Sequence, residues 1–156
     1  MSVERFRGEH FFLSNMYPLA VPISSEVGLL VPTSEHAYQS AKFVDPEAQY
    51  LIASLETGKE AKRAAHRLEE QGAVLRADWD VAKAGIMLTI VRDKFTRNAD
   101  IAEMLLATGN EELVEGNPWG DRFWGVDPVG SRNGLNHMGK ILMIVRDELK
   151  PAALAL

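Results

Sequence analysis

The sequence predicts a predominantly helical α+β domain with a few short strands and a glycine-rich loop. Apolar residues recur at helical spacing along much of the chain from residue 33 onward. Residues 3–31 instead hold short apolar runs broken by prolines and glycines, which leaves room only for strands a few residues long. Between positions 110 and 139 glycine recurs every four or five residues, which is typical of a long loop.

The individual elements follow from caps and breakers in the sequence. Residues 20–23 and 29–31 are expected to pair across the turn at 24–28, and the aromatic run at Phe11 and Phe12 is expected in the core. Thr33 or Ser34 can cap the first helix, which Asp45-Pro46 ends. Further helices are expected over 46–55, 59–71, from an Asp78 cap through Phe95, over 99–107 and over 140–149. The predicted buried stripe of the longest helix is Val81, Ala84, Leu88, Val91 and Phe95.

Length and composition are those of one soluble domain. The chain has 156 residues, of which 46% are hydrophobic and 25% charged. We expect a single domain over 1–150 and a frayed tail over 151–156. No apolar run is long enough to cross a bilayer and the start has no apolar signal core, so a cytoplasmic location is expected. Without cysteine there is no disulfide, thiol nucleophile or thiolate metal site.

The net charge of −5 argues against a general duplex-DNA binder, because such binding needs many lysines and arginines on phosphates. A local basic pocket stays possible. Lys59, Lys62, Arg63 and Arg67 cluster in one expected helix, where they either hold phosphates or form a solvated face.

Two polar stripes are candidate sites. Glu35, Tyr38, Gln39 and Lys42 recur at helical spacing, so an acid, a phenol, an amide and an amine share one helix face. This face is either a site or an exposed helix surface. The second stripe, on the longest helix, consists of Trp79, Lys83, Met87, Ile90 and Lys94. Its lysines either point to one pocket edge or border a core. Ser14 and Asn15, in a loop beside the aromatic run, are either turn formers or ligand contacts.

Several familiar sites are missing from the sequence. The segment from Gly134 to Ile141 lacks the serine or threonine that a P-loop needs after its lysine. The 4 histidines show no paired ligand spacing, so no metal site is expected. No Gly-x-Ser-x-Gly elbow is present. Glu35 and His36 point about 100° apart on a helix, and we prefer Glu35 because it belongs to the polar stripe.

The remaining chemical inventory suits the hydrolysis of an N-glycosidic bond. Carboxylates can bind sugar hydroxyls, activate water or stabilise an oxocarbenium-like transition state, and indoles stack on planar bases. The relevant groups are the carboxylates Glu35 and Asp121, the indoles Trp79, Trp119 and Trp124, and the amides Gln39, Asn117 and Asn136.

The chain resembles the NADAR family, also called YbiA-like, in many blocks that occur in the family's order. The matching blocks are 11–15, 34–43, 76–79 with Lys83 and Met87, 94–95 with Asn98, 105–109, 113–115, Asp121 with 124–125, Gly134, Asn136, Gly139, 141–143 and Arg146. Met16 and Met138 replace a common phenylalanine and leucine, and both stay apolar. Residues 126–130 depart from the family's small turn, which leaves substrate specificity open.

The resemblance implies an N-glycosidase acting at a ribose C1 without metal or redox cofactor. The implied substrates are an ADP-ribose conjugate, such as ADP-ribosylated guanine in nucleic acid, or an early riboflavin-pathway ribosylamino-pyrimidine phosphate. Glu35, Asp121 and Trp79 are the expected catalytic residues. The expected substrate-binding residues are Ser14, Asn15, Tyr38, Gln39, Lys42, Lys62, Lys83, Lys94, Trp124, Gly125 and Asn136. The alternative is a module that binds ADP-ribose without cleaving it.

Overall fold

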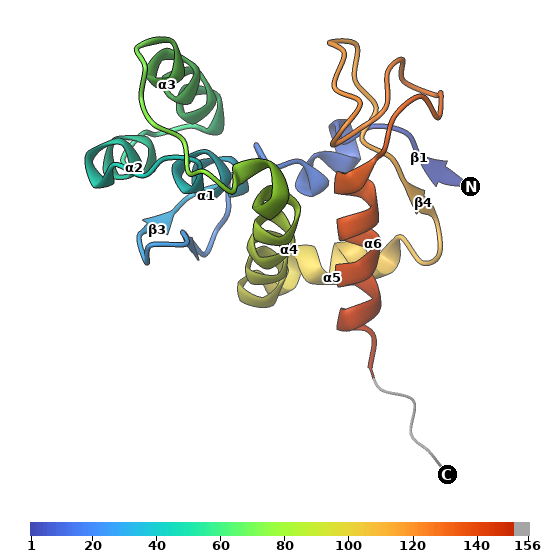
Figure 1. The fold of residues 1–156 in the computed structure, drawn as a ribbon. Helices are drawn as coiled ribbons and strands as arrows, with labels where there is room; N and C mark the ends of the chain where they lie inside the picture. The colour runs from blue at the N-terminus through green and yellow to red at the C-terminus, as the bar shows by residue number, and fades with distance from the viewer. Residues whose placement is uncertain (152–156) are drawn as a thin grey trace. The chain divides into compact units, whose positions relative to one another are not determined.

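The computed structural model describes residues 1–151 and shows a helical chain with short strands (Figure 1). In chain order the elements are β1 (Ser2–Val3), the 3-10 helix η1 (Gly8–Leu13), β2 (Ile23–Ser24), β3 (Leu30–Val31), α1 (Ser34–Ala41), α2 (Pro46–Ala53), α3 (Gly58–Glu70), α4 (Trp79–Arg97), α5 (Ala99–Ala107), β4 (Glu112–Leu113) and α6 (His137–Leu149). This content confirms the predicted fold class. The tail expected at 151–156 lies, apart from Pro151, outside the described residues. Within residues 1–151, no helix has both the length and the apolar character needed to cross a membrane.

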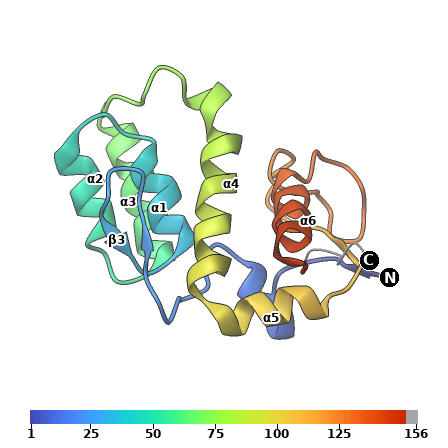
Figure 2. The same cartoon turned by 90° about the horizontal axis from the view of Figure 1, so that it is seen from below.

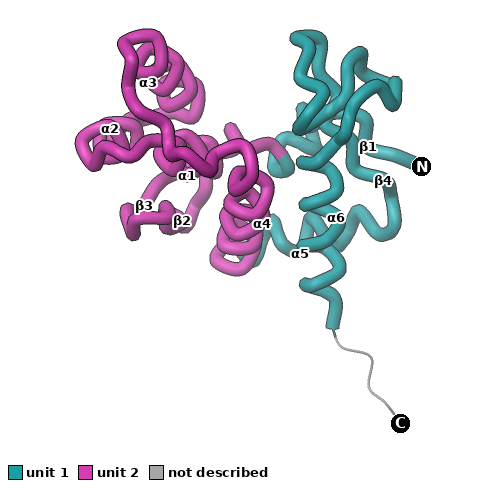
Figure 3. The backbone as a smooth tube through the Cα atoms, viewed as in Figure 1, with its two compact units in different colours: residues 1–13, 99–156 teal, residues 14–98 magenta. Residues whose placement is uncertain are grey.

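Residue contacts divide the chain into two compact units, which Figure 3 colours separately. One unit contains residues 14–98. The other contains residues 1–13 together with the chain from residue 99 onward. The expectation of one domain over 1–150 stays a prediction, and each unit is described by itself.

Helix α1 is the centre of the unit formed by residues 14–98, and it packs against α2, α3 and α4. Every residue from Ser34 to Ala41 is buried. Figure 2 shows α1, α2 and α3 grouped together. Their common core contains Phe43, Ala48, Ile52, Ala61, Ala64 and Ala65. The alanines matter because small side chains let neighbouring helices approach closely.

The predicted starts of the first two helices are confirmed by their caps. The Thr33 hydroxyl accepts a 3.2 Å hydrogen bond from His36 N, and the Asp45 carboxylate accepts one of 3.0 Å from Glu47 N. Asp78 occupies the N-cap position of α4 as predicted, but its side chain makes no capping hydrogen bond within residues 1–151. Its Oδ1 instead accepts a 2.7 Å hydrogen bond from Nε of Arg76. A guanidinium two residues away competes successfully for the same carboxylate.

The buried side of α4 differs from the stripe predicted for it. Val81 is 89% exposed, so the first part of that prediction is wrong. The buried residues of α4 are Trp79, Met87, Ile90, Val91, Lys94 and Phe95. The burial of Lys94 explains the error, since helical periodicity counts lysine as polar although its long apolar stem packs well in a core.

The segment before α1 combines a confirmed hairpin with an unexpected helix. β2 and β3 pair antiparallel, with Ile23 opposite Val31, as predicted. Residues 8–13 form the 3-10 helix η1 rather than an extended piece. Phe12 is buried but Phe11 is 39% exposed, so the expected burial of Phe11 is wrong. Neighbouring residues on a helix point in different directions, and only one of the two rings can face the core.

The other unit joins the start of the chain to its last third. β1 pairs parallel with β4, and α5 packs against α6. Arg146 of α6 is buried, and its Nη1 donates to Thr108 Oγ1 at 2.9 Å and to Glu111 O at 2.8 Å. α6 begins at His137 rather than at the expected residue 140, directly after the left-handed residue Asn136. The preceding glycine-rich loop is anchored by a bridge between Gly116 and Val126.

Candidate active site

Glu35 lies in the first turn of α1 with only 7% of its surface exposed. Its Oε1 accepts a 2.7 Å hydrogen bond from Nε2 of Gln39, one helical turn further on. Burial raises the pKa of the Glu35 carboxyl, because desolvation disfavours the charged form. The Gln39 hydrogen bond and the charges of Lys62, Lys42 and His66 oppose this rise without cancelling it. A raised pKa makes this carboxylate a stronger base than that of an exposed glutamate, which suits a group that takes a proton from water.

The backbone and Cβ of Glu35 are held by the loop before α1 and by the start of α3. Glu35 N donates a 3.0 Å hydrogen bond to Asn15 O. A Cβ added to Gly58 would lie 3.3 Å from Glu35 Cβ and 2.8 Å from Met16 Sδ, so the start of α3 lies close against this residue. The Ser14 hydroxyl accepts a 3.1 Å hydrogen bond from Met16 N, which is the role of a turn former. The loop at 14–16 therefore borders Glu35.

Lys42 and Lys62 bring positive charge toward Glu35 from two helices. Lys42 follows the last residue of α1 and forms a 2.7 Å ion pair with Glu69 of α3, its side chain being only 13% exposed. Lys62 is partly buried within α3. The exposed members of the same basic cluster are Lys59, Arg63 and Arg67. The cluster thus divides into one lysine near Glu35 and a solvated face.

Tyr38 and Trp79 form an aromatic pair beside the Glu35 face of α1. Their ring centroids lie 5.0 Å apart with planes inclined by 49°, and the two residues are 8% and 7% exposed. Tyr38 follows Glu35 by three residues, so the two side chains share one face of the helix. Trp79 is the first residue of α4. The structure therefore brings the predicted indole to the helix that carries the predicted acid.

The two lysines expected at one pocket edge have different environments. Lys94 is 1% exposed, and its Nζ donates a 3.0 Å hydrogen bond to Ser14 O. The same ammonium lies 5.9 Å from the centroid of the Tyr17 ring. Lys83 is more exposed, and its Nζ lies 3.8 Å from Asp80 Oδ1. Lys94 thus supports the loop that borders Glu35, while Lys83 lies nearer the start of α4.

His36 holds the start of α1 in place. Its Nδ1 lies 2.7 Å from Thr33 Oγ1 and its Nε2 lies 2.8 Å from Leu55 O. A backbone carbonyl only accepts hydrogen bonds, so we assign the proton to Nε2 and let Nδ1 accept from the Thr33 hydroxyl. Both ring nitrogens of this fully buried residue are engaged. This geometry supports the choice of Glu35 over His36 as the reactive group.

We expect the buried His36 ring to make stability depend on pH. Burial lowers the pKa of His36 below the value of about 6.5 of an exposed imidazole. As the pH falls, the unfolded chain therefore takes up this proton first, and stability is lost between the two pKa values. The free energy of unfolding should fall by up to about 1.4 kcal/mol per pH unit below about pH 6.5.

Urea unfolding at a series of pH values checks this prediction. The series is best run in the Glu35→Gln background, because the raised pKa of the Glu35 carboxyl produces a slope of opposite sign. Adding His36→Gln should remove the His36 part of the slope. The same slope in the Glu35→Gln protein with and without His36→Gln would contradict the role of His36 in this pH dependence.

Asp121 lies in the glycine-rich loop of the unit that contains residues 1–13, and its side chain organises that loop. Its Oδ1 accepts hydrogen bonds of 3.1 Å from Phe123 N and 2.9 Å from Trp124 N. The buried Asn117 accepts a 3.0 Å hydrogen bond from Asp121 N and donates one of 2.8 Å to Asp121 O. One oxygen of the Asp121 carboxylate is therefore already used by the backbone.

Trp124 belongs to a small aromatic cluster around the same loop. Its ring meets Phe123 edge-on at 4.8 Å, and the Phe123 ring lies 4.5 Å from the ring of His137 at the start of α6. Trp119, in contrast, is 59% exposed. Of the two indoles in the loop, Trp124 is thus the one placed by ring packing and by Asp121.

Gly125 and Asn136 pack this loop against β4 and the residues that follow it. A Cβ at Gly125 would overlap Glu115 O and lie 3.0 Å from Asn117 Nδ2, so only glycine fits here. Asn136 accepts a 2.9 Å hydrogen bond from Glu115 N with Oδ1 and donates one of 3.0 Å to Leu113 O with Nδ2. Both ends of the Asn136 amide hold the backbone, which gives this residue a structural role whatever it contributes to binding.

The predicted site residues therefore fall into two sets. Those in the unit of residues 14–98 are Ser14, Asn15, Glu35, Tyr38, Gln39, Lys42, Lys62, Trp79, Lys83 and Lys94. Those in the other unit are Asp121, Trp124, Gly125 and Asn136. Their catalytic and binding roles stay predictions.

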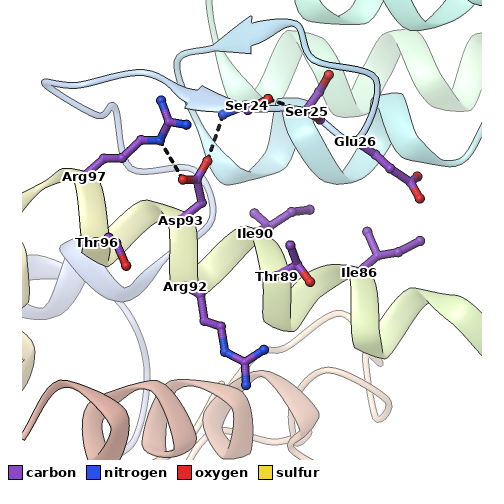
Figure 4. A pocket seen from close by; sticks show the side chains of 10 residues that line it. All are labelled: Ser24, Ser25, Glu26, Ile86, Thr89, Ile90, Arg92, Asp93, Thr96 and Arg97. Carbon is purple, nitrogen blue, oxygen red and sulfur yellow. Dashed lines mark hydrogen bonds and ion pairs between the residues drawn. The ribbon is translucent and has the colours of Figure 1, made fainter.

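A pocket of ≈ 570 Å³ lies between α4 and the β2–β3 turn (Figure 4). It is lined by Ser24, Ser25, Glu26, Ile86, Thr89, Ile90, Arg92, Asp93, Thr96 and Arg97. None of these is an expected catalytic or substrate-binding residue, and Ile90 alone belongs to one of the two predicted stripes. Asp93 accepts hydrogen bonds of 2.9 Å from Ser24 N and 2.6 Å from Arg97 Nε, so its charge is compensated within the pocket wall.

Residues 4–150 match the NADAR domain, and the chain belongs to the NADAR family. The solution structure of Escherichia coli YbiA has a similar fold, with a TM-score of 0.77 and 30% identity, covering 96% of this chain and 83% of that chain.

Curated relatives have two kinds of name. An N-glycosidase of Nostoc punctiforme is 42% identical over 118 residues, covering 76% of this chain and 74% of that protein. The N-glycosidase YbiA of E. coli is 33% identical over 118 residues, covering 76% of this chain and 70% of that protein. A riboflavin biosynthesis protein of Vibrio vulnificus is 39% identical over 144 residues, covering 92% of this chain. The chain spans only 37% of the length of that relative.

Proposed function

We propose that this chain is an N-glycosidase that hydrolyses a ribosyl N-glycosidic bond. The observation that carries the proposal is the buried Glu35 carboxyl, hydrogen-bonded to Gln39 on a helix whose face also carries the Tyr38–Trp79 pair. An acid whose pKa is raised by burial, on a helix whose Tyr38 packs against an indole, supports the proposal because the reaction needs proton transfer and a wall for a planar base. The names of the Nostoc and E. coli relatives support the same reaction class.

In the proposed mechanism, the charged Glu35 carboxylate accepts a proton from water while the water oxygen forms a bond to ribose C1. The electron pair of the C1–N bond leaves with the base, whose nitrogen takes up a proton from solvent water, and Glu35 returns its own proton to solvent, so hydroxide is added to the sugar and hydrogen to the base. Trp79 walls or stacks on the leaving base. Asp121 positions a hydroxyl or the water, and the roles of the two carboxylates can be exchanged.

The proposed substrate is an ADP-ribose conjugate, such as ADP-ribosylated guanine in nucleic acid, or a ribosylamino-pyrimidine phosphate. Lys42 and Lys62 favour a phosphate-bearing substrate, because both place positive charge near Glu35. The riboflavin-related name of the Vibrio relative favours the second substrate class. The acidic net charge of −5 favours a free metabolite or a flipped or single-stranded base over intact duplex DNA.

The test is a comparison of two substrates with purified protein. An oligonucleotide carrying ADP-ribosyl-guanine is assayed for released ADP-ribose, beside a riboflavin-pathway ribosylamino substrate assayed for the released base. Cleavage of the first alone assigns an ADP-ribosyl glycosidase, and cleavage of the second alone assigns a metabolite hydrolase. If neither is cleaved while ADP-ribose binds, the enzyme proposal fails and the chain is a binding module.

A further inference from the structure

The amide of Gln39 has one end bonded and one end unsatisfied. Its Nε2 donates to Glu35 Oε1 at 2.7 Å. Its Oε1 is buried and has no hydrogen-bond partner among residues 1–151. Gln39 itself is only 3% exposed, so bulk water does not readily reach that oxygen. A buried acceptor without a donor destabilises the folded state. The presence of such an acceptor in a closely packed helix such as α1 therefore needs an explanation.

The reason lies in what a carboxyl group can do in its two protonation states. A charged carboxylate only accepts hydrogen bonds, and it needs the NH2 end of the amide. A protonated carboxyl can donate, and it then needs the C=O end. A half-turn of the amide about its last side-chain torsion exchanges the two ends, and this torsion has a broad, roughly two-fold profile. The unsatisfied Oε1 is therefore the acceptor that a protonated Glu35 would use.

We propose that Gln39 is the positioning residue of Glu35, donating to its carboxylate before the reaction and accepting from its carboxylic acid after the proton has been taken from water. This inference rests on the proposed N-glycosidase function. It gives Gln39 a role different from a contact with substrate. Because the pair keeps one hydrogen bond in both states, Glu35 stays in the same place while its charge changes.

The other charged groups around Glu35 all act on the same equilibrium. Lys42 at the end of α1, and Lys62 and His66 on α3, favour the charged carboxylate. The helices packed against α1 carry further titratable groups. On α3 this group is Glu69, which forms an ion pair with Lys42. On α4 the groups are Lys83 and Lys94, and on α2 they are the exposed Glu47 and Tyr50. The Gln39 amide can serve both states, whereas a cation favours the charged form alone.

The first test measures Glu35 itself and needs no substrate. The carbon-13 signal of its side-chain carboxyl is followed through a pH titration, and Glu35→Gln identifies the signal by its disappearance. In Gln39→Met, which keeps the length of the side chain and loses the amide, the midpoint should rise by about half a pH unit or more, because the hydrogen bond to the charged form is the stronger one. The matched control is Ser40→Ala, which removes another buried unpartnered polar atom of α1 and should leave the midpoint unchanged.

The second test uses the native protein, so it holds even if Gln39→Met does not fold. The nitrogen-15 signals of the Gln39 amide should shift with the same midpoint as the Glu35 carboxyl. The proposal is overturned if the Gln39 amide signals do not change during the Glu35 titration, or if the midpoint is unchanged in Gln39→Met.

Once a cleaved substrate is known, Gln39→Met should lower kcat with little change in KM. A raised KM with unchanged kcat would make Gln39 a ligand anchor. If no substrate is cleaved, the proposed function fails while both titrations still decide the role of Gln39.

Discussion

Replacing Glu35 with glutamine should lower turnover by a factor on the order of 100 or more while ligand binding is largely retained. The amide keeps the size of the side chain and much of its hydrogen bonding, but it cannot take a proton from water. The measurement is kcat and KM on the cleaved substrate, together with ligand affinity by calorimetry. The variant should also be at least as stable as the native protein at neutral pH, since a buried charge with a raised pKa is removed.

The matched control for this change is Glu103→Gln. Glu103 is exposed on α5, so the same loss of one carboxylate there should leave kcat and KM unchanged. Equal losses of binding and turnover in Glu35→Gln would make Glu35 a ligand anchor. Full turnover in the variant would remove it from the mechanism.

Gly125→Ala should destabilise the protein by about 1–3 kcal/mol. The new methyl group would overlap Glu115 O and press against Asn117 Nδ2, and the bridge between Gly116 and Val126 lies directly beside it. The backbone of Glu115 and the buried side chain of Asn117 cannot both move away without breaking the hydrogen bonds that hold the loop. The check is the free energy of unfolding from urea denaturation.

Gly85→Ala is the control for adding a methyl group. Gly85 is exposed within α4, and a Cβ there would meet nothing within 4 Å. Alanine in a helix interior should stabilise by roughly 0.5–1 kcal/mol relative to glycine, so the two substitutions should have opposite signs. A neutral Gly125→Ala would show that the loop can shift at this point.

The local elements were predictable because short stretches of sequence contain the interactions that form them. Thr33 caps α1 through a hydroxyl three residues before the amide it binds, and Asp45-Pro46 both ends one helix and starts the next. The Glu35–Gln39 hydrogen bond joins residues four apart, which face one another on any helix. The stripe that carries the candidate site followed from the same spacing.

The capping bond of Asp78 and the burial of Val81 and Phe11 were mispredicted because these outcomes depend on competing partners. Asp78 is a residue type that often caps helices and it stands at the capping position, but the Arg76 guanidinium binds its carboxylate. Val81 fits the apolar period of α4 and yet faces solvent. Lys94, in contrast, is buried and donates a hydrogen bond to Ser14 O. No pattern of apolar residues specifies which neighbouring element will cover a helix face.

The sequence by itself determined the helical class, most helix boundaries, the β2–β3 pairing and the polar face of α1. Only the tertiary structure decided that Glu35 is buried, that His36 is bonded at both ring nitrogens, and that the acceptor end of Gln39 finds no partner among residues 1–151. Helix propensity and capping act between residues a few positions apart, whereas desolvation depends on atoms brought from distant parts of the chain. The pKa of Glu35 is therefore a property of packing, and sequence spacing contains no information about it.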